Sequence, residues 1–257
     1  MSSLVVDARG VGKIFGQGDE RVEALRDINL EVGAHEFVSL IGPSGCGKST
    51  LLRLIGDLVK PTSGRLTING EAPGQARMNR AYGIVFQKAT LLDWRTVAKN
   101  VELPLEIMGV DGRHDIATRM LDLVQLSEFG DHYPWQLSGG MQQRVAIARA
   151  LAFNPALLLM DEPFGALDEM TRELMQQEVL RIWAKTNTTV LFVTHSIPEA
   201  VFLSTRVVVM SPRPGRISHV IEIGLSQPRD IDTRESQLYY DMITEVREAL
   251  RSPEALS

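Results

Sequence analysis

The feature that most constrains this chain is the stretch GPSGCGKST, which occupies residues 42–50. It fits the pattern G-x-x-x-x-G-K-[ST], follows the apolar run EFVSLIG (36–42) and precedes the helical sequence STLLRLIG (49–56). A glycine-rich turn between a strand and a helix lets backbone N–H groups surround phosphates, and the helix N-terminus adds partial positive charge. The sequence therefore predicts a nucleotide-phosphate site formed by Gly42, Pro43, Ser44, Gly45, Cys46, Gly47, Lys48, Ser49 and Thr50.

Two side chains of this stretch carry its polar chemistry. We expect Lys48 to neutralise the terminal phosphates and the Ser49 hydroxyl to ligate Mg²⁺. Cys46 is the only cysteine among 257 residues, so no disulfide can form within the chain. We interpret this cysteine as a residue that fills space in the loop.

Short apolar runs indicate the fold class. The runs at 36–42, 156–162 and 188–195 are nearly continuous and rich in Val, Leu and Ile, which is typical of strands buried on both faces of a parallel sheet. Helical patterns separate these runs, and residues 88–153 are mostly helical in pattern. We therefore predict an α/β fold with a P-loop NTPase core and an inserted helical subdomain.

The end of the chain carries two further signals. RVVVM (206–210) and ISHVIEI (217–223) flank a turn-rich sequence and predict a hairpin. Beyond the hairpin, SQLYYDMITEVREAL (236–250) predicts an amphipathic helix. We predict a nucleotide-binding domain over residues 1–224 and a C-terminal helical appendix over residues 225–257.

Two carboxylates follow the apolar run ALLLM. Asp161 and Glu162 emerge at the carboxyl end of this predicted strand, where open α/β sheets bind their ligands. We expect Asp161 to hold Mg²⁺ directly or through water. Glu162 points elsewhere and is the candidate general base that polarises the attacking water. The alternative for either residue is a cap on the following helix.

A histidine and a glutamine end two further predicted strands. His195 follows TTVLFVT, and SIPE after it predicts a capping box between Ser196 and Glu199. We interpret His195 as a contact to the γ-phosphate; the alternative is a structural histidine. Gln87 ends the run AYGIVFQ and is a candidate for the Mg²⁺ and water network, although the glutamine alone does not decide this.

A second anion-binding pattern lies far from the first. In LSGGMQQR (137–144), Ser138, Gly139 and Gly140 open a predicted helix whose free backbone N–H groups suit an anion. The chain therefore contains two places that can hold phosphate.

These motifs together resemble the nucleotide-binding subunit of an ABC transporter. The resemblance rests on GPSGCGKST, Gln87, LSGGM, LLLMDEP, GALD (165–168) and His195, and it covers roughly residues 4–223. It implies a RecA-like core, an N-terminal antiparallel β region and ATP hydrolysis with Mg²⁺. It also implies a head-to-tail homodimer in which the signature of one chain covers ATP held by the other.

The resemblance assigns further roles to individual residues. Ser138, Gly139 and Gly140 would touch the γ-phosphate held by the partner, and Asp168 would cross the interface. Phe15 would stack on adenine; on the sequence alone an aromatic at this position is more often a core residue, so this role depends on the family resemblance. Met141 replaces the glutamine that commonly ends the signature, and we expect it to face its own domain's interior.

Four segments indicate which subfamily of ABC transporters the chain resembles. LSGGM, DEPFGALD, LLDWRTVAKNV and MSPRPGRI are similar to importer ATPases for nitrate, sulfonate, taurine and bicarbonate. This similarity implies a peripheral ATPase on the cytoplasmic face of a bacterial membrane, with integral permease subunits and, indirectly, a solute-binding protein. Leu91, Leu92 and Trp94 would then receive the permease; the alternative is ordinary helical packing.

Composition excludes some function classes. The 27 basic and 32 acidic residues give a net charge of −5, and the single cassette lacks sustained heptads, which disfavours a nucleic-acid partner. The aliphatic runs fall far short of the roughly 18 residues of a membrane span. Alternatives are the ATPase of an exporter or lipid-trafficking system, or a non-transport ABC ATPase such as a scaffold for metal-cofactor assembly.

Overall fold

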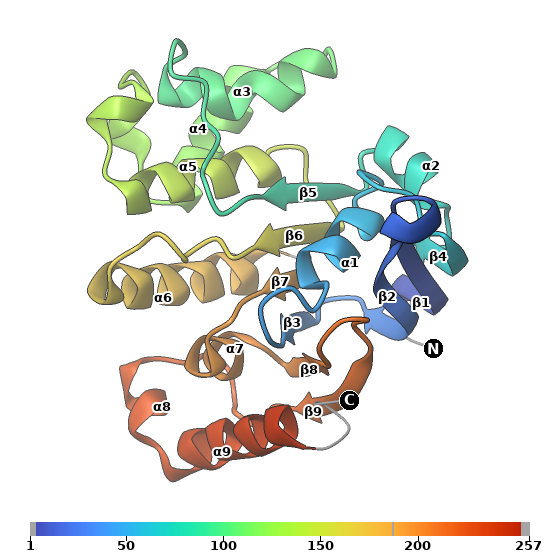
Figure 1. The fold of residues 1–257 in the computed structure, drawn as a ribbon. Helices are drawn as coiled ribbons and strands as arrows, with labels where there is room; N and C mark the ends of the chain where they lie inside the picture. Colours follow the sequence, from blue (N-terminus) through green and yellow to red (C-terminus); the bar gives the residue numbers. More distant parts are fainter. Residues whose placement is uncertain (1–3, 187, 253–257) are drawn as a thin grey trace.

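Parallel strands build the centre of the molecule, which the computed structural model describes for residues 4–186 and 188–252 (Figure 1). Among these residues, one sheet comprises β3 Phe37–Ile41, β5 Tyr82–Val85, β6 Leu157–Asp161, β7 Thr189–Val193, β8 Arg206–Met210 and β9 Ile217–Glu222. The order across the sheet is β5-β6-β7-β3-β8-β9. All neighbours pair in parallel except β8 and β9. The predicted parallel sheet and the late hairpin are therefore confirmed.

Alternate residues of each central strand point to opposite faces of this sheet. On β6, Leu158 and Met160 belong to one buried cluster, whereas Leu157 and Leu159 belong to another. Because both faces are covered, these strands are apolar at almost every position.

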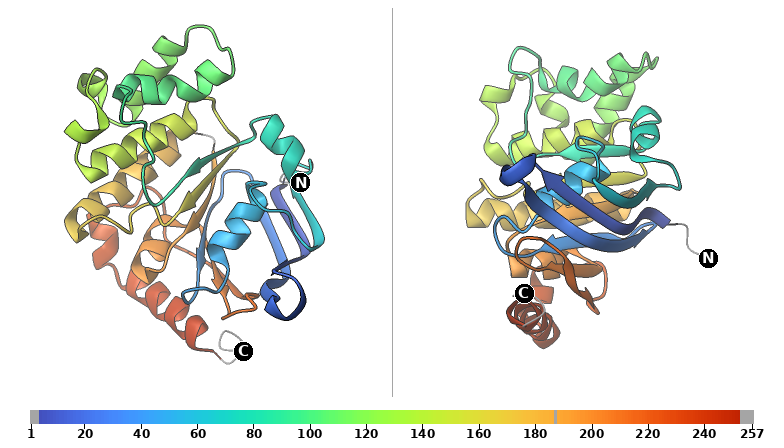
Figure 2. Two further views of the ribbon diagram at one scale, coloured as in Figure 1. Left: turned by 45° about the horizontal axis from the view of Figure 1, so that its top comes forward. Right: turned by 45° about the vertical axis from the view of Figure 1, so that its right-hand side comes forward.

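An antiparallel sheet covers one face of the molecule. It comprises β1 Leu4–Phe15, β2 Val22–Gly33 and β4 Ser63–Ile68, in the order β2-β1-β4. Its apolar side chains share a buried cluster with α1 (Lys48–Ile55). Figure 2 shows α1 between this sheet and the central sheet. The N-terminal antiparallel region implied by the family resemblance is present.

Helices α3 (Val97–Ile107), α4 (Arg113–Leu123) and α5 (Gly139–Leu151) pack together beside β5 (Figure 1). Within the predicted helical region 88–153, the first helix begins only at Val97, where the Thr96 side chain caps α3 by accepting the N–H of Lys99 at 3.3 Å. The remaining short helices before α5 are η1 Gly18–Glu20, α2 Pro73–Met78, η2 Ser127–Phe129 and η3 Pro134–Gln136. Within the described ranges, no helix combines the length and apolar character needed to span a bilayer.

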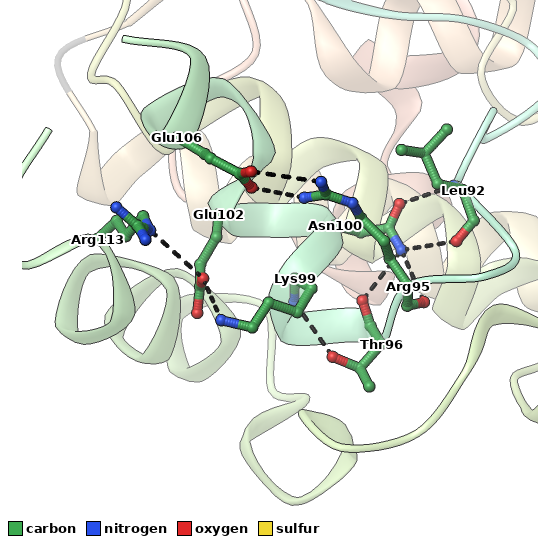
Figure 3. Close-up of polar contacts among 8 residues, drawn as sticks. All are labelled: Leu92, Arg95, Thr96, Lys99, Asn100, Glu102, Glu106 and Arg113. Atoms are coloured by element: carbon green, nitrogen blue, oxygen red, sulfur yellow. Dashed lines mark hydrogen bonds and ion pairs between the residues drawn. The ribbon is translucent and has the colours of Figure 1, made fainter. Parts of the chain in front are cut away.

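One buried amide holds the segment that precedes α3. Asn100 is completely buried, and its Oδ1 accepts the N–H of Leu92 at 2.7 Å (Figure 3). Its Nδ2 donates to the carbonyls of Leu92, Arg95 and Thr96 at 3.0–3.1 Å. A loop leaves such backbone groups without helical or sheet partners, so this amide fixes the shape of the segment.

The C-terminal segment packs against the rest of the fold. It contains α8 Ile231–Glu235 and α9 Gln237–Arg251, and α9 contacts β8 and α7 (Ile197–Leu203). The buried side of α9 consists of Tyr239, Ile243, Val246 and Ala249. The predicted amphipathic helix is confirmed, whereas the division of the chain at residue 225 stays a prediction.

Arg229 fastens this segment to α7. The arginine is buried, and its guanidinium donates to the carbonyls of Val201, Phe202 and Ser204 at 2.8–3.0 Å. These carbonyls lie at the end of α7, where the helix dipole concentrates partial negative charge. Burial lowers the pKa of Arg229 to about 10, so the side chain remains charged at neutral pH.

Removing apolar volume beneath α9 should destabilise the whole fold. Ile243 is 7% exposed, and we expect Ile243→Ala to lower the free energy of unfolding by about 2–4 kcal/mol. Leu238→Ala is the matched control, because Leu238 lies on the same helix at 45% exposure and should cost less than about 0.5 kcal/mol. Urea unfolding measures both values; equal effects would show that α9 does not depend on this packing.

Candidate functional site

Residues 42–47 connect β3 to α1 and run tightly against neighbouring backbone. Gly47 has a φ of 105°, and a Cβ there would lie 2.5 Å from Cδ2 of Leu25. A Cβ on Gly42 would lie 2.6 Å from the carbonyl oxygen of Met210. Both positions therefore require glycine, which explains two of the residue types in the motif.

Lys48 lies inside this loop. Its side chain is buried, and its ammonium donates to the carbonyls of Gly42 at 2.7 Å and Pro43 at 3.1 Å. Its third contact is a weak one, to Sγ of Cys46 at 3.8 Å. An anion at the loop needs only to replace this weak contact to gain a charged donor.

A cavity of about 360 Å³ opens beside the loop. Its lining comprises Phe15, Val22, Ala24, Ser44, Gly45, Gly47, Lys48, Ser49, Thr50, Glu162 and Arg213. Phe15 at the end of β1 and Val22 at the start of β2 pair with each other and are 41% and 39% exposed, so the cavity has an apolar wall. The cavity thus joins a cationic loop, a carboxylate and an exposed aromatic ring.

Three of these lining residues were not predicted. Val22 and Ala24 come from β2, whose sequence carries no signal for a site. Arg213 lies in the turn after β8. Because β8 runs parallel to β3, the position of that turn at the carboxyl edge of the sheet was the signal that could have identified Arg213.

Ser49 and Asp161 meet at this edge of the sheet. The Ser49 hydroxyl donates to Oδ1 of Asp161 at 2.7 Å, although the two residues are 112 positions apart. A hydroxyl and a carboxylate are hard oxygen donors of the kind that Mg²⁺ prefers. The pair fits the predicted metal, and Gln87 is the remaining candidate ligand.

Gln87 lies in the loop after β5, and the prediction that it ends the strand is wrong. The strand stops at Val85, and the next carbonyl, that of Phe86, accepts the side-chain amide of Gln143 at 3.0 Å. The Nε2 of Gln87 lies 2.9 Å from the position of a Cβ on Gly165. Since Gly165 follows Glu162 closely, the absence of a side chain there lets Gln87 approach the carboxylate segment.

Helix α5 holds the same loop through a second residue. Arg149 donates to the carbonyls of Ala89 and Thr90, both at 2.9 Å. Together with Gln143, this guanidinium ties residues 86–90 to the helix that begins at the signature sequence.

Glu162 and His195 face each other at the ends of neighbouring strands. Oε2 of Glu162 lies 3.3 Å from Nδ1 of His195, and their side chains are 28% and 63% exposed. Glu162 has a φ of 47°, a left-handed conformation that is rare for residues with a side chain. Such backbone strain is found preferentially at functional sites. The geometry therefore places a solvent-accessible carboxylate and imidazole beside the phosphate loop.

The predicted capping box after His195 is only half correct. Ser196 does cap α7, accepting the N–H of Glu199 at 3.4 Å. The Glu199 carboxylate, however, accepts the hydroxyl proton of Thr194 and the amide of Gln176 at 3.1 Å. The N–H of Ser196 donates to Oγ1 of Thr194 at 3.0 Å, because that hydroxyl takes the place of the expected carboxylate.

The signature residues lie at the start of α5. Ser138 caps the helix by accepting the N–H of Met141 at 3.3 Å, and both Ser138 and Gly139 are exposed. Gly140 is buried, with Cγ2 of Thr171 only 2.8 Å from the position of a Cβ. Met141 packs against the core, as predicted.

Asp168 lies just before α6 (Glu169–Lys185). Its carboxylate is exposed and caps the helix by accepting the N–H of Thr171 at 3.0 Å. This hydrogen bond holds the pKa of Asp168 below its usual value.

The two phosphate-binding patterns do not converge within one chain. Ser138 and Gly140 line a cavity of about 620 Å³ between α5 and α6. Among the described residues, this cavity and the one beside Lys48 share no lining residue.

Comparison with known protein families agrees with these features. The family model described as "ABC transporter" matches residues 25–165. A taurine import ATP-binding protein of Rhizobium johnstonii is 52% identical over 198 residues, covering 76% of this chain and 75% of that protein. A nitrate import ATP-binding protein of Synechocystis is 47% identical over 234 residues, covering 89% and 85%.

A solved structure is also similar. It is the dimeric structure of a post-hydrolysis state of an ATP-binding cassette bound to ADP and Pi. It matches with a TM-score of 0.73 at 37% identity and covers 86% of this chain and 100% of that chain.

The tight turn at Gly47 gives a test of the nucleotide cavity. Gly47→Ala must place a side chain in a left-handed conformation against Leu25, which costs about 1–2 kcal/mol and should weaken ATP binding about tenfold. Gly224→Ala is the control, because a Cβ there has no neighbour within 4 Å. Calorimetric titration with ATP measures both; unchanged affinity in a folded Gly47→Ala protein would contradict the site.

Proposed function

The chain belongs to the ABC transporter family of ATP-binding proteins, and from this membership we propose that its ATPase activity drives the import of a small oxyanion or organic solute, such as nitrate, a sulfonate or taurine. The relatives named as taurine and nitrate import ATP-binding proteins support this assignment. The sulfonate group of taurine and the nitrate ion are both oxyanions, so the solutes named for these two relatives share this chemistry.

One observation carries the proposed mode of action, which is a head-to-tail dimer. The cavity beside Lys48 and the cavity beside Ser138 are separate among the described residues, so neither chain alone surrounds a nucleotide with both patterns. In a head-to-tail pair, Ser138, Gly139 and Gly140 of one chain approach the ATP held by the other, and Asp168 lies at the interface. The dimeric relative bound to ADP and Pi supports this arrangement.

Within one half of that dimer, the residues predicted from the sequence have proposed roles at the cavity. Residues 42–50 surround the phosphates, with Lys48 pairing with their charge, and Phe15 stacks on adenine. Ser49, Asp161 and Gln87 hold Mg²⁺, which when bound neutralises charge that develops on the phosphates.

Glu162 is the proposed general base. Its carboxylate lines the cavity beside Lys48 and is 28% exposed, so water reaches it. It accepts a proton as the water attacks the γ-phosphate. His195, 3.3 Å from this carboxylate, contacts the γ-phosphate and orients the base.

Loss of the base should separate binding from hydrolysis. Glu162→Gln keeps the size and hydrogen-bonding reach of the side chain but cannot accept a proton, so we expect turnover to fall by about 10²–10⁴-fold. ATP affinity should stay within twofold of the parent protein. Single-turnover assays measure the rate; a variant with half the parent rate would remove Glu162 from this role.

The permease-facing surface is proposed to include Leu91, Leu92 and Trp94. Trp94 is 75% exposed, and the Asn100 amide fixes the backbone on both sides of it. With this surface against the permease, the proposed location is the cytoplasmic face of the inner membrane, and the proposed partners are integral permease subunits and, through them, a solute-binding protein. No nucleic acid takes part. The helical block at 88–153 would then form the subdomain between permease and nucleotide.

Mixed dimers test the head-to-tail arrangement. Ser138→Arg and Lys48→Ala each damage both sites of a homodimer, whereas a heterodimer combines both defects at one site and leaves the other intact. We expect ATPase activity to recover partly on mixing, measured with permease present, and ATP-dependent heterodimers to form. If folded variants show neither recovery nor heterodimers, the signature acts within its own chain.

A further inference from the structure

A buried carboxylate lies directly behind His195. Glu199, in the first turn of α7, is 5% exposed. Its Oε2 accepts the hydroxyl proton of Thr194, and Oγ1 of Thr194 in turn accepts the N–H of Ser196 at 3.0 Å. Glu199 therefore holds the residues on both sides of His195, and the backbone between them has little freedom to shift.

The same carboxylate is connected to the C-terminal segment. Its Oε1 accepts the side-chain amide of Gln176 on α6 at 3.1 Å, and Oε1 of Gln176 accepts the guanidinium of Arg234 on α8 at 2.6 Å. Gln176 is 3% exposed. The contacts thus form a continuous polar path from α8 to the backbone at His195.

Arg234 is itself fixed in place. Its guanidinium lies 3.8 Å from the centre of the Phe202 ring and 3.6 Å from a carboxylate oxygen of Glu173. Arg229, a few residues earlier, anchors the same segment to the end of α7. The C-terminal segment therefore presents Arg234 from a rigid position.

The arginine at one end of this path determines which group donates and which accepts in the hydrogen bonds along it. Arginine only donates, so Gln176 must turn its oxygen to Arg234 and its NH₂ to Glu199. The ionised carboxylate of Glu199 then accepts from both Gln176 and Thr194. Burial raises the pKa of Glu199, and these two donors oppose that effect.

We propose that Glu199 is a positioning residue for His195 and that Arg234, acting through Gln176, holds it in place, so that the C-terminal segment contributes to ATP hydrolysis. This inference rests on the proposed role of His195 at the γ-phosphate. None of the three residues touches the nucleotide cavity; they act on the backbone that carries the imidazole.

Glu199→Gln tests the direction of the bonds with little change in volume. If the new amide keeps accepting from Thr194, its NH₂ faces Gln176, which then directs its own NH₂ at Arg234, donor against donor. In the other orientation its NH₂ faces the Thr194 hydroxyl, whose proton then loses its acceptor. We expect kcat to fall about tenfold, because a small misplacement of a catalytic group has effects of this size or larger. KM for ATP should change less than twofold.

The double variant Gln176→Glu with Glu199→Gln restores the pattern. The new carboxylate accepts from both Arg234 and the new amide, whose oxygen remains free for Thr194. We expect kcat to return to within about twofold of the parent value. If the two positions did not interact, the losses in kcat from the two single variants would instead add in free energy. A purely structural role of the buried carboxylate predicts no such rescue.

His195→Ala separates this proposal from the function on which it rests. In that background Glu199→Gln should have no further effect on kcat, because no imidazole remains to be positioned. Ser236→Ala is the control within the C-terminal segment: it removes the cap of α9 and should lower the melting temperature without changing kcat.

Three outcomes would overturn the proposal. Unchanged kcat in folded Glu199→Gln, or the same fold-loss with and without His195, would reject Glu199 as a positioning residue while leaving the role of His195 intact. Full activity of His195→Ala itself would reject both. The assays use the full chain, with circular dichroism to show that each variant is folded.

Discussion

Backbone hydrogen bonds between β3, β6, β7 and β8 bring the ends of four parallel strands to one edge. Leu40 pairs with Val193 and Ile41 with Val209, so the loops that follow these strands begin side by side. Asp161 also pairs with Val193, which places the carboxylate segment next to His195. A slip of one residue in any of these pairings would turn its side chains to the opposite face and separate the groups of the site.

The glycines and the polar groups at this edge act together. Glycine at 42 and 47 allows the phosphate loop to lie against Met210 and Leu25, and Lys48 is thereby held inside the loop. The Ser49 and Asp161 oxygens meet because α1 starts directly after that loop. The cavity is therefore a product of close backbone approach more than of side-chain shape.

Sequence patterns predicted the features that depend on local order. Apolar runs identified β3, β6 and β7, and the G-x-x-x-x-G-K-[ST] spacing identified the loop, because both signals lie within a few residues. Arg213 escaped prediction because it reaches the cavity from a turn whose place depends on the pairing of β8. The capping box at Ser196 was half wrong because the Thr194 hydroxyl accepts the Ser196 N–H, while Gln176, from another helix, and Thr194 both donate to the Glu199 carboxylate. The contacts of Arg213 and Gln176 both depend on the packing of elements that are distant in the sequence.

The bonds from Gln143 and Arg149 to residues 86–90 have a mechanical meaning. A helix is stiff along its axis, and these two side chains clamp the loop to α5 at points almost two turns apart. Helix and loop are therefore held as one unit, and a displacement of α5 would carry the segment that contains Gln87 with it.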